Sequence, residues 1–184
     1  MSVTFLGNGP AITIQDLGRP NQIAAGLSRG GAMDQLALLE AAALLQSPSV
    51  LPALEIAGFG GTFKIETQTR IALTGSPMAA SLEGLPLAWN HTHLIPAGST
   101  LQLGACRSGI YGYLTFAVGT NSPTHLGSQS AHLMAGIGAA LGPGERIEHD
   151  QDPDPGRGQQ GLGAEARFGG GHVPGVRGQA SGTV

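Results

Sequence analysis

The chain has 184 residues, of which 41% are hydrophobic and only 11% charged, and its formal net charge is −3. This length suits one ordinary domain, and the lack of a basic surplus argues against nucleic-acid binding, which needs cations to neutralise phosphates. A single cysteine excludes an intrachain disulfide, no apolar run approaches the roughly 18–20 residues of a membrane span, and no signal peptide is visible. We therefore expect a cytoplasmic protein that binds neither membranes nor nucleic acids.

The first 46 residues contain two strand-like segments, a loop and a helix. "SVTFLG" and "AITIQD" predict short strands joined by a hairpin or a tight corner at "GNGP". The loop runs from Leu17 to Gly31, and Pro20 interrupts regular structure there. Apolar residues at helical spacing then predict a helix over about 32–46, with Asp34 in its first turn and Pro48 after its end.

The segment after Pro52 is rich in short β-like runs separated by turns. Together with the N-terminal pair they give about eight to ten strands, with a further short helix near 131–136 and a last strand after "LGPGE". Short strands with turns every 8–12 residues, combined with 31 glycines, predict a mainly β barrel or sandwich with one clear helix.

The composition changes at about Asp150. Residues 156–184 contain ten glycines and few large apolar side chains, so they cannot bury enough surface to offset the entropy of ordering. We expect a β domain over 1–150 and a glycine-rich, disordered tail over 151–184. The abrupt change also suggests a shifted reading frame or a truncation, which resequencing the locus would test.

Two side-chain patterns outside the loop could indicate catalysis or metal binding. Cys106 has no histidine beside it in the sequence that could act as a base, so we interpret it as a turn or buried cysteine. His91 and His93 would share one face of a strand and could hold a metal, with Glu83 and His125 as unsupported further ligands. We interpret the pair as edge-strand histidines and predict no metal site.

The charged loop is the best candidate site. Gln15 and Asp16 end a strand and Arg19 follows, which is where a rigid scaffold presents polar groups to a ligand. Ser28 and Gly30–Gly31 precede the predicted helix, where backbone amides can bind an anion. The alternative is structural: an Asp–Arg pair that braces a turn, followed by a helix cap. Residue chemistry alone slightly favours the structural interpretation.

A series of motifs resembles a known family. This is the carboxyltransferase-domain family, also called allophanate hydrolase subunit 2, which includes the C subunit of 5-oxoprolinase, the KipA-like proteins and the carboxyltransferase part of urea carboxylase. The resemblance covers about residues 3–148 and rests on these segments, in order: "ITIQDLGRP", "GLSRGGAMDQLAL", "PALEIAGFGGTFKIE", "IALTGSPMAASLEGLPLAWN", "IPAGSTLQLG", "SGIYGYLTFAVG" and "HLGSQSAHLMAGIG".

The resemblance implies a cyclophilin-like β-barrel subdomain whose related second subdomain is missing, so that residues 1–150 form an incomplete domain. It implies a groove shared by both subdomains and the B subunit of the enzyme, a KipI-like protein similar to allophanate hydrolase subunit 1, with the A subunit as a possible further partner. With this resemblance, a functional role of the charged loop is favoured over a purely structural one. The residues that we predict to bind substrate are Gln15, Asp16, Arg19, Ser28, Gly30, Gly31, Asp34, Glu55 and Arg107.

The implied reaction is the ATP-dependent hydrolysis of 5-oxoproline to glutamate, together with the B subunit. Arg19, Gly30–Gly31 and Arg107 would stabilise developing negative charge, and Asp16, Asp34 and Glu55 would orient substrate or partner groups. ATP is implied by the resemblance alone, since the chain has no phosphate-loop motif. One alternative is a biotin-dependent carboxyltransferase acting on urea or another amide, and another is a non-catalytic, KipA-like binding protein.

Overall fold

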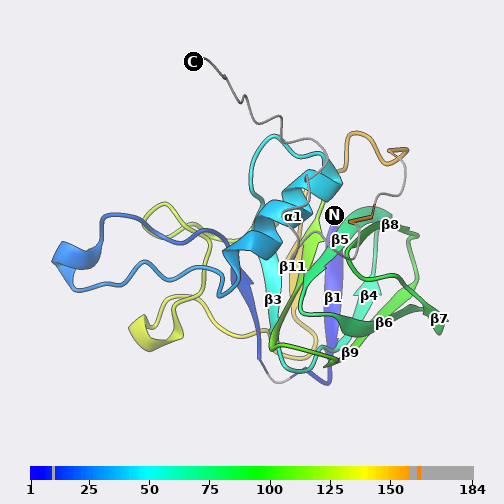
Figure 1. The fold of residues 1–184 in the computed structure, drawn as a ribbon, viewed down its shortest axis with the longest axis horizontal. Helices are drawn as coiled ribbons and strands as arrows, with labels where there is room; N and C mark the ends of the chain where they lie inside the picture. Colours follow the sequence, from blue (N-terminus) through cyan, green and yellow to red (C-terminus); the bar gives the residue numbers. More distant parts are fainter. Residues whose placement is uncertain (10, 158–160, 163–184) are drawn as a thin grey trace, which may run out of the picture.

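The computed structural model describes residues 1–9, 11–157 and 161–162, and it shows two antiparallel sheets with one α-helix (Figure 1). The six-stranded sheet has the order β11-β1-β4-β9-β6-β7, with bounds Arg146–Glu148, Ser2–Gly7, Thr62–Ile65, Thr100–Cys106, Met78–Leu82 and Leu85–Pro86. The five-stranded sheet has the order β2-β3-β10-β5-β8, with bounds Ile12–Gln15, Ala53–Ala57, Tyr111–Phe116, Thr69–Gly75 and His91–Ile95.

The main core lies between the two sheets, because each contributes buried apolar side chains to one cluster. Phe5 and Phe63 on neighbouring strands of the six-stranded sheet place their ring centroids 5.2 Å apart. Ile71 and Phe116 come from the five-stranded sheet and are fully buried in the same cluster. Alternation along each strand produces these two inward faces.

The single α-helix among the described residues, α1 (Gln35–Leu45), covers the other face of the five-stranded sheet and contacts β5, β10 and β8. Its buried residues include Ala37, Leu38, Ala41 and Leu45. The hydroxyl of Thr74 on β5 donates to the Ala37 carbonyl at 2.9 Å, which fastens the first turn of the helix to the sheet.

The mainly β architecture predicted from the sequence is confirmed, with differences in detail. Neither sheet closes on itself, so the described residues form a sandwich and the structure does not confirm a barrel. The described chain contains eleven strands, one more than the upper end of the predicted range, and the last strand predicted after "LGPGE" is β11. The first two strands belong to different sheets, so they do not form a hairpin with each other.

Two long loops project from one end of the sandwich, on the left of Figure 1. We name them the 16–34 loop, which contains the short 3₁₀-helix η1 (Ile23–Ala25), and the 121–140 loop, which contains η2 (Leu133–Ala135). The short helix predicted near 131–136 corresponds to η2. The candidate site lies where these loops join the sandwich.

The beginning of the segment predicted as a tail packs against the domain. Asp152 is 6% exposed and accepts hydrogen bonds at 2.9 and 3.3 Å from the guanidinium of Arg70, itself 5% exposed on β5. Leu162 is also buried, against α1 and β5 residues. The prediction of disorder for 158–160 and 163–184 lies outside the described residues.

The 11-residue α1 is the longest helix in the described ranges, and no helix there has the length and apolarity to cross a membrane.

Candidate functional site

The carboxylate of Asp16 joins the two projecting loops. Its Oδ1 accepts hydrogen bonds from the Gly18 amide at 2.7 Å, the Ser128 hydroxyl at 2.6 Å and the Ser130 hydroxyl. Its Oδ2 accepts from the Gln129 amide at 2.7 Å, while the Asp16 amide donates to the Ser130 hydroxyl oxygen at 2.8 Å. The end of β2 is thereby fixed to residues 128–130, which are distant in the chain.

The same contacts determine the ionisation of Asp16. Burial raises the pKa of a carboxyl group, but the hydrogen bonds from Ser128, Ser130, Gln129 and Gly18 outweigh it, and the pKa of Asp16 is lowered below 3.8. Asp16 is therefore a carboxylate at neutral pH whose lone pairs are largely used within the protein. The structure places it as a positioning residue for the two loops, and its predicted contact with substrate stays a prediction.

Arg19 is completely buried beside this junction. Its Nη2 donates to the Ser130 carbonyl and its Nε to the His125 carbonyl at 3.4 Å. Among the described residues no carboxylate forms an ion pair with it, and its Nη1 has no hydrogen-bond partner there. The predicted pairing of Asp16 with Arg19 is therefore wrong. Each of the two side chains forms its own hydrogen bonds with the 121–140 loop.

Glycines hold the two ends of the 16–34 loop at close range. The Arg19 amide donates to the Arg29 carbonyl and the Ala32 amide to the Asp16 carbonyl, both at 2.9 Å. A Cβ on Gly18 would lie 2.6 Å from the Gly30 carbonyl oxygen, and one on Gly31 would lie 2.7 Å from the Gly18 nitrogen. Both glycines also have positive φ, so this crossing of backbones requires glycine for two reasons.

We expect Gly18→Ala to open the base of the 16–34 loop. The added methyl group would clash with backbone and sit at φ +81°, a combined cost of about 3 kcal/mol or more. Amide hydrogen exchange at Arg19 and Ala32 should accelerate strongly. The control is Gly26→Ala, whose φ is +78° with nothing within 4 Å, and whose cost is the strain alone, about 1–2 kcal/mol. Equal effects of the two variants would contradict the close approach.

Ser28 and His132 meet across the loops. The Ser28 hydroxyl lies 2.7 Å from Nε2 of His132, a hydrogen bond between side chains 104 positions apart. Ser28 is exposed and His132 half-buried, so the pair is accessible to solvent. Sequence reasoning selected Ser28 and not His132, because nothing in the local pattern shows which residue of the other loop faces it.

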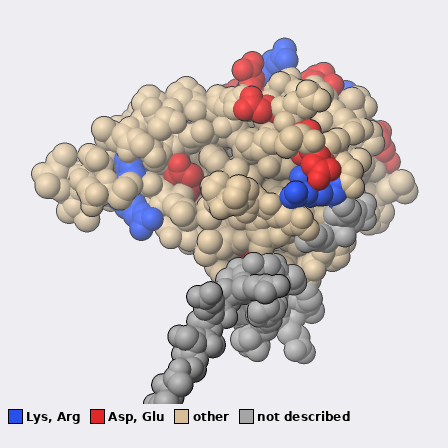
Figure 2. All heavy atoms as spheres, turned by 90° about the horizontal axis from the view of Figure 1, so that it is seen from above, with Lys and Arg blue, Asp and Glu red and all other residues tan. Residues whose placement is uncertain are grey.

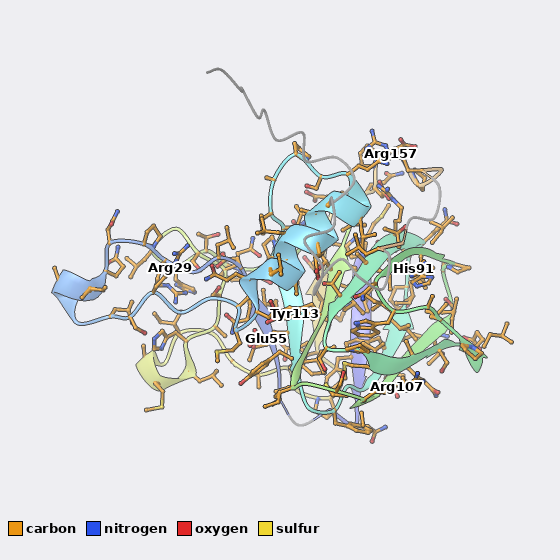
Figure 3. All side chains as sticks on the ribbon, viewed as in Figure 1. Arg29, Glu55, His91, Arg107, Tyr113 and Arg157 are labelled. Carbon is orange, nitrogen blue, oxygen red and sulfur yellow. The ribbon has the colours of Figure 1, made fainter. Side chains whose placement is uncertain are left out.

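The first turn of α1 is anchored by a buried network. The Tyr113 hydroxyl on β10 donates to Oε2 of Glu55 on β3 at 2.7 Å and accepts from the Asp34 amide at 2.7 Å. Glu55 Oε2 also accepts from the Met33 amide at 2.7 Å. Burial and the Glu55 carboxylate raise the pKa of the Tyr113 hydroxyl, so it stays a donor at neutral pH. Figure 3 shows Glu55 and Tyr113 together beside the helix.

The helix start differs from the prediction and changes how its neighbours are interpreted. Helix α1 begins at Gln35, with Asp34 as its N-cap accepting from the Ala37 amide at 3.2 Å, because Glu55 and Tyr113 hold the amides of residues 33 and 34. Gly30–Gly31 thus lie further ahead of the helix than predicted, since α1 begins at Gln35, and their predicted contact with substrate stays a prediction.

We expect Tyr113→Phe to lower the free energy of unfolding by about 1–2 kcal/mol, because it leaves the Asp34 amide without its acceptor. Chemical denaturation measures the loss. Tyr111→Phe is the matched control on the same strand, since the described residues show no hydrogen bond of the Tyr111 hydroxyl. If Tyr111→Phe is as destabilising as Tyr113→Phe, the hydrogen bonds of the Tyr113 hydroxyl contribute nothing beyond the loss of a tyrosine hydroxyl on this strand.

The remaining candidates lie away from the loops. Arg107 is exposed just after β9 and appears at the opposite end of Figure 3 from Arg29, so the structure does not bring it to the loop site. His91 Nδ1 and His93 Nε2 lie 2.9 and 2.7 Å from backbone carbonyls, and the Cys106 thiol lies 3.2 Å from the Ile110 carbonyl. Within the described ranges, no group of three or more His, Cys, Asp or Glu residues could hold a metal ion.

A cavity of about 620 Å³ opens on the six-stranded sheet. Its polar lining comes from Asn8, Thr62, Ser81 and Gln102, and its apolar lining includes Phe59. None of the described residues that line it is lysine or arginine. Figure 2 likewise shows a largely uncharged face with charged side chains in small groups, one of them on the projecting loops.

The match to a family model over most of the chain identifies the family. The chain belongs to the family described as the carboxyltransferase domain, subdomain A and B, whose model matches residues 25–175.

Three known proteins show how far the similarity extends. The chain is 35% identical to the C subunit of 5-oxoprolinase from Haemophilus influenzae over 71% of its length, and 36% identical to that of Escherichia coli over 80%. It spans 42% and 46% of those proteins, about half their length. Its structure resembles urea amidolyase of K. lactis with a TM-score of 0.79 and 28% identity, covering 84% of this chain and 10% of the other.

The segment that sequence reasoning did not assign is Ser128–Ser130. It supplies two hydroxyls and one amide to Asp16 and one carbonyl to Arg19. The only signal for it was its inclusion in the "HLGSQSAHL" motif, since serine and glutamine in a loop have no chemical signature of their own.

Proposed function

We propose that this chain acts as the C-subunit-like component of a 5-oxoprolinase, in the ATP-dependent hydrolysis of 5-oxoproline to glutamate. The observation that carries the proposal is the identity of 35% and 36% to the C subunits of two 5-oxoprolinases over most of the chain. The described sandwich is, in this proposal, one of two related cyclophilin-like β subdomains that form a groove with the B subunit, with the A subunit as a possible further component.

The loop site fits one wall of such a groove. Arg19, Ser28 and His132 lie together at the junction of the two loops, which Asp16 and Ser130 hold in place. The remaining predicted substrate contacts on this wall are Gln15, Gly30, Gly31 and Asp34, with Glu55 acting from behind through the helix start. Arg107 lies away from the projecting loops in Figure 3, so it would meet a ligand or partner separately from this wall.

The described residues do not fit ATP. The cavity on the six-stranded sheet has no lysine or arginine in its lining to neutralise phosphates, and no phosphate-loop sequence is present. We therefore place ATP binding on a partner protein and derive no step through it. We expect the chain alone to show no turnover.

The test is reconstitution from purified components. The chain is mixed with homologues of the other two subunits, A and B, and each component is assayed alone and together with the rest. The assays measure ATP hydrolysis that depends on 5-oxoproline and the formation of glutamate. The proposal expects turnover only in the mixture. Turnover that depends on urea in the presence of a biotin carboxylase, with none on 5-oxoproline, would contradict it.

A carboxyltransferase acting on urea or another amide is the second candidate, with biotin on another chain. The structural similarity to K. lactis urea amidolyase favours it. A third outcome of the same experiment is a stable complex with the B subunit, without turnover on any substrate. That result would indicate a non-catalytic, KipA-like binding protein.

A further inference from the structure

The two projecting loops present large apolar side chains to solvent at three tips. Ile23 on η1 is 80% exposed, Leu133 and Met134 on η2 are 57% and 95% exposed, and Leu126 in the turn 125–128 is 57% exposed. We call these four residues the loop tips. Neither η1 nor η2 contains a buried residue, so the tips add nothing to the core. Because both loops project from the same end of the sandwich (Figure 1), exposed apolar surface gathers there, which is typical of an interaction site.

Hydrogen bonds hold the three tips in fixed positions relative to one another. The Ser28 hydroxyl, shortly after η1, lies 2.7 Å from Nε2 of His132, the residue before η2. Arg19 donates to the His125 carbonyl at the start of the 125–128 turn, and the backbones of His125 and Ser128 pair across that turn. A partner would therefore meet apolar side chains on backbone that is already ordered, which reduces the entropic cost of association.

The charge near the tips differs from that of the chain as a whole. The formal net charge of the chain is −3, yet residues 17–33 and 121–140 contain no aspartate or glutamate. The two carboxylates of the 16–34 loop, Asp16 and Asp34, lie at its base, while Arg29 is exposed between them in the sequence. A complementary surface would be apolar at its centre and would place a carboxylate opposite Arg29.

We propose that the loop tips form a docking surface for a partner protein of different sequence, which receives Ile23 and Met134 in apolar pockets and binds Arg29 with a carboxylate. Methionine and arginine are enriched in protein interfaces, and a few anchors that fill pockets carry most of the binding energy. The surface rests on the proposed function only in taking the B subunit as the partner to be tested.

Two other occupants match these charges less well. Anionic membranes attract clusters of about four to eight Lys or Arg side chains, each contributing about 1 kcal/mol, whereas Arg29 is the single exposed arginine or lysine of these two described loops. A second copy of the chain, docked tip to tip, would bring the same cation and the same acid-free segments together, so it offers no charge complementarity.

The experiment measures the affinity of the full chain for a purified homologue of the B subunit by isothermal titration calorimetry. We expect Ile23→Ser and Met134→Ser each to raise the Kd at least about tenfold, because each removes an apolar anchor. Leu85→Ser is the matched control, since Leu85 is 72% exposed on β7, on the opposite side of Figure 1, and its replacement should leave the Kd unaltered.

Two further measurements separate docking from folding and from nonspecific attraction. Chemical denaturation should give the wild-type free energy of unfolding for Ile23→Ser and Met134→Ser, because η1 and η2 contain no buried residue. Arg29→Glu should raise the Kd several-fold at low salt and less at high salt, because salt screens the interaction of an exposed charge.

Tip variants that bind as tightly as the wild type, an equal loss in Leu85→Ser, or no complex with the B homologue would each overturn the docking surface. Binding to phosphatidylserine vesicles, or self-association in sedimentation, would also overturn it if the tip variants abolish that binding. Turnover in the reconstituted mixture that the tip variants leave unchanged would overturn the surface and leave the proposed function intact. A complex that depends on the tips, without turnover, would support the surface and contradict the proposed function.

Discussion

Asp16→Ala is expected to lower the free energy of unfolding by about 2–4 kcal/mol and to release the two projecting loops from each other. The substitution removes the acceptor of four hydrogen bonds and leaves the donors at Gly18, Ser128, Gln129 and Ser130 without it. Denaturation measures the global loss. Hydrogen exchange at the amides of Gly18 and Gln129 measures the local release and should increase most there.

The effect of Asp16 should depend on pH in one direction. Because the folded-state pKa is lowered below 3.8, the carboxylate contributes stability that is present above that value and is lost as the pH falls through the folded pKa. The difference in stability between the wild type and Asp16→Asn should therefore shrink between about pH 6 and about pH 2. A difference that stays constant across this range would contradict the assignment of Asp16 as an ionised acceptor.

Asp152→Ala is expected to cost still more, about 3–5 kcal/mol, because it leaves the Arg70 guanidinium buried without its counter-ion. The double variant Arg70→Met with Asp152→Leu should recover much of the loss, since it removes both charges from the interior. Thermal and chemical denaturation of the single and double variants form a double-mutant cycle that measures the coupling.

The exposed pair Arg157–Asp154 provides the matched control. Its side chains are 45% and 51% exposed, so Asp154→Ala should change stability by less than about 1 kcal/mol. If Asp152→Ala is no more harmful than Asp154→Ala, residues 151–157 do not pack on the domain as described.

Much of the fold follows from local sequence. Alternating apolar residues and frequent glycine turns predict a mainly β protein, and the apolar run over about 32–46 predicts the helix. The residues of that run that pack on the sheet are not those with the predicted spacing, since Leu36 and Leu39 are about half exposed whereas Leu38 and Leu45 are buried. The error at the helix start has a tertiary cause, since Glu55 and Tyr113 take the amides of residues 33 and 34 and Asp34 becomes the cap. Helix propensity depends on the residues of the segment itself and carries no information about hydrogen-bond partners that lie far away in the sequence.

The candidate site, like the fold, was predictable from the sequence only in part. Charged residues are scarce in this chain, and their presence in the loop predicts Asp16 and Arg19 as site residues. Both lie at the junction of the two loops in the structure. Their partners, Ser128–Ser130 and His132, have no pattern that distinguishes them from ordinary loop residues, so only the folded chain reveals them.

The sequence by itself determined the family, the β-rich class and the position of the loop, because motifs and hydrophobic periodicity are local properties of the chain. The tertiary structure decided that Asp16 and Arg19 bind the 121–140 loop instead of each other, that Arg107 lies apart from the loop site, and that Asp152 pairs with Arg70 in the interior. These contacts form between segments that are distant in the sequence. Because a buried charge or polar group without a partner costs roughly several kcal/mol at most sites, the fold must supply a partner for each of them.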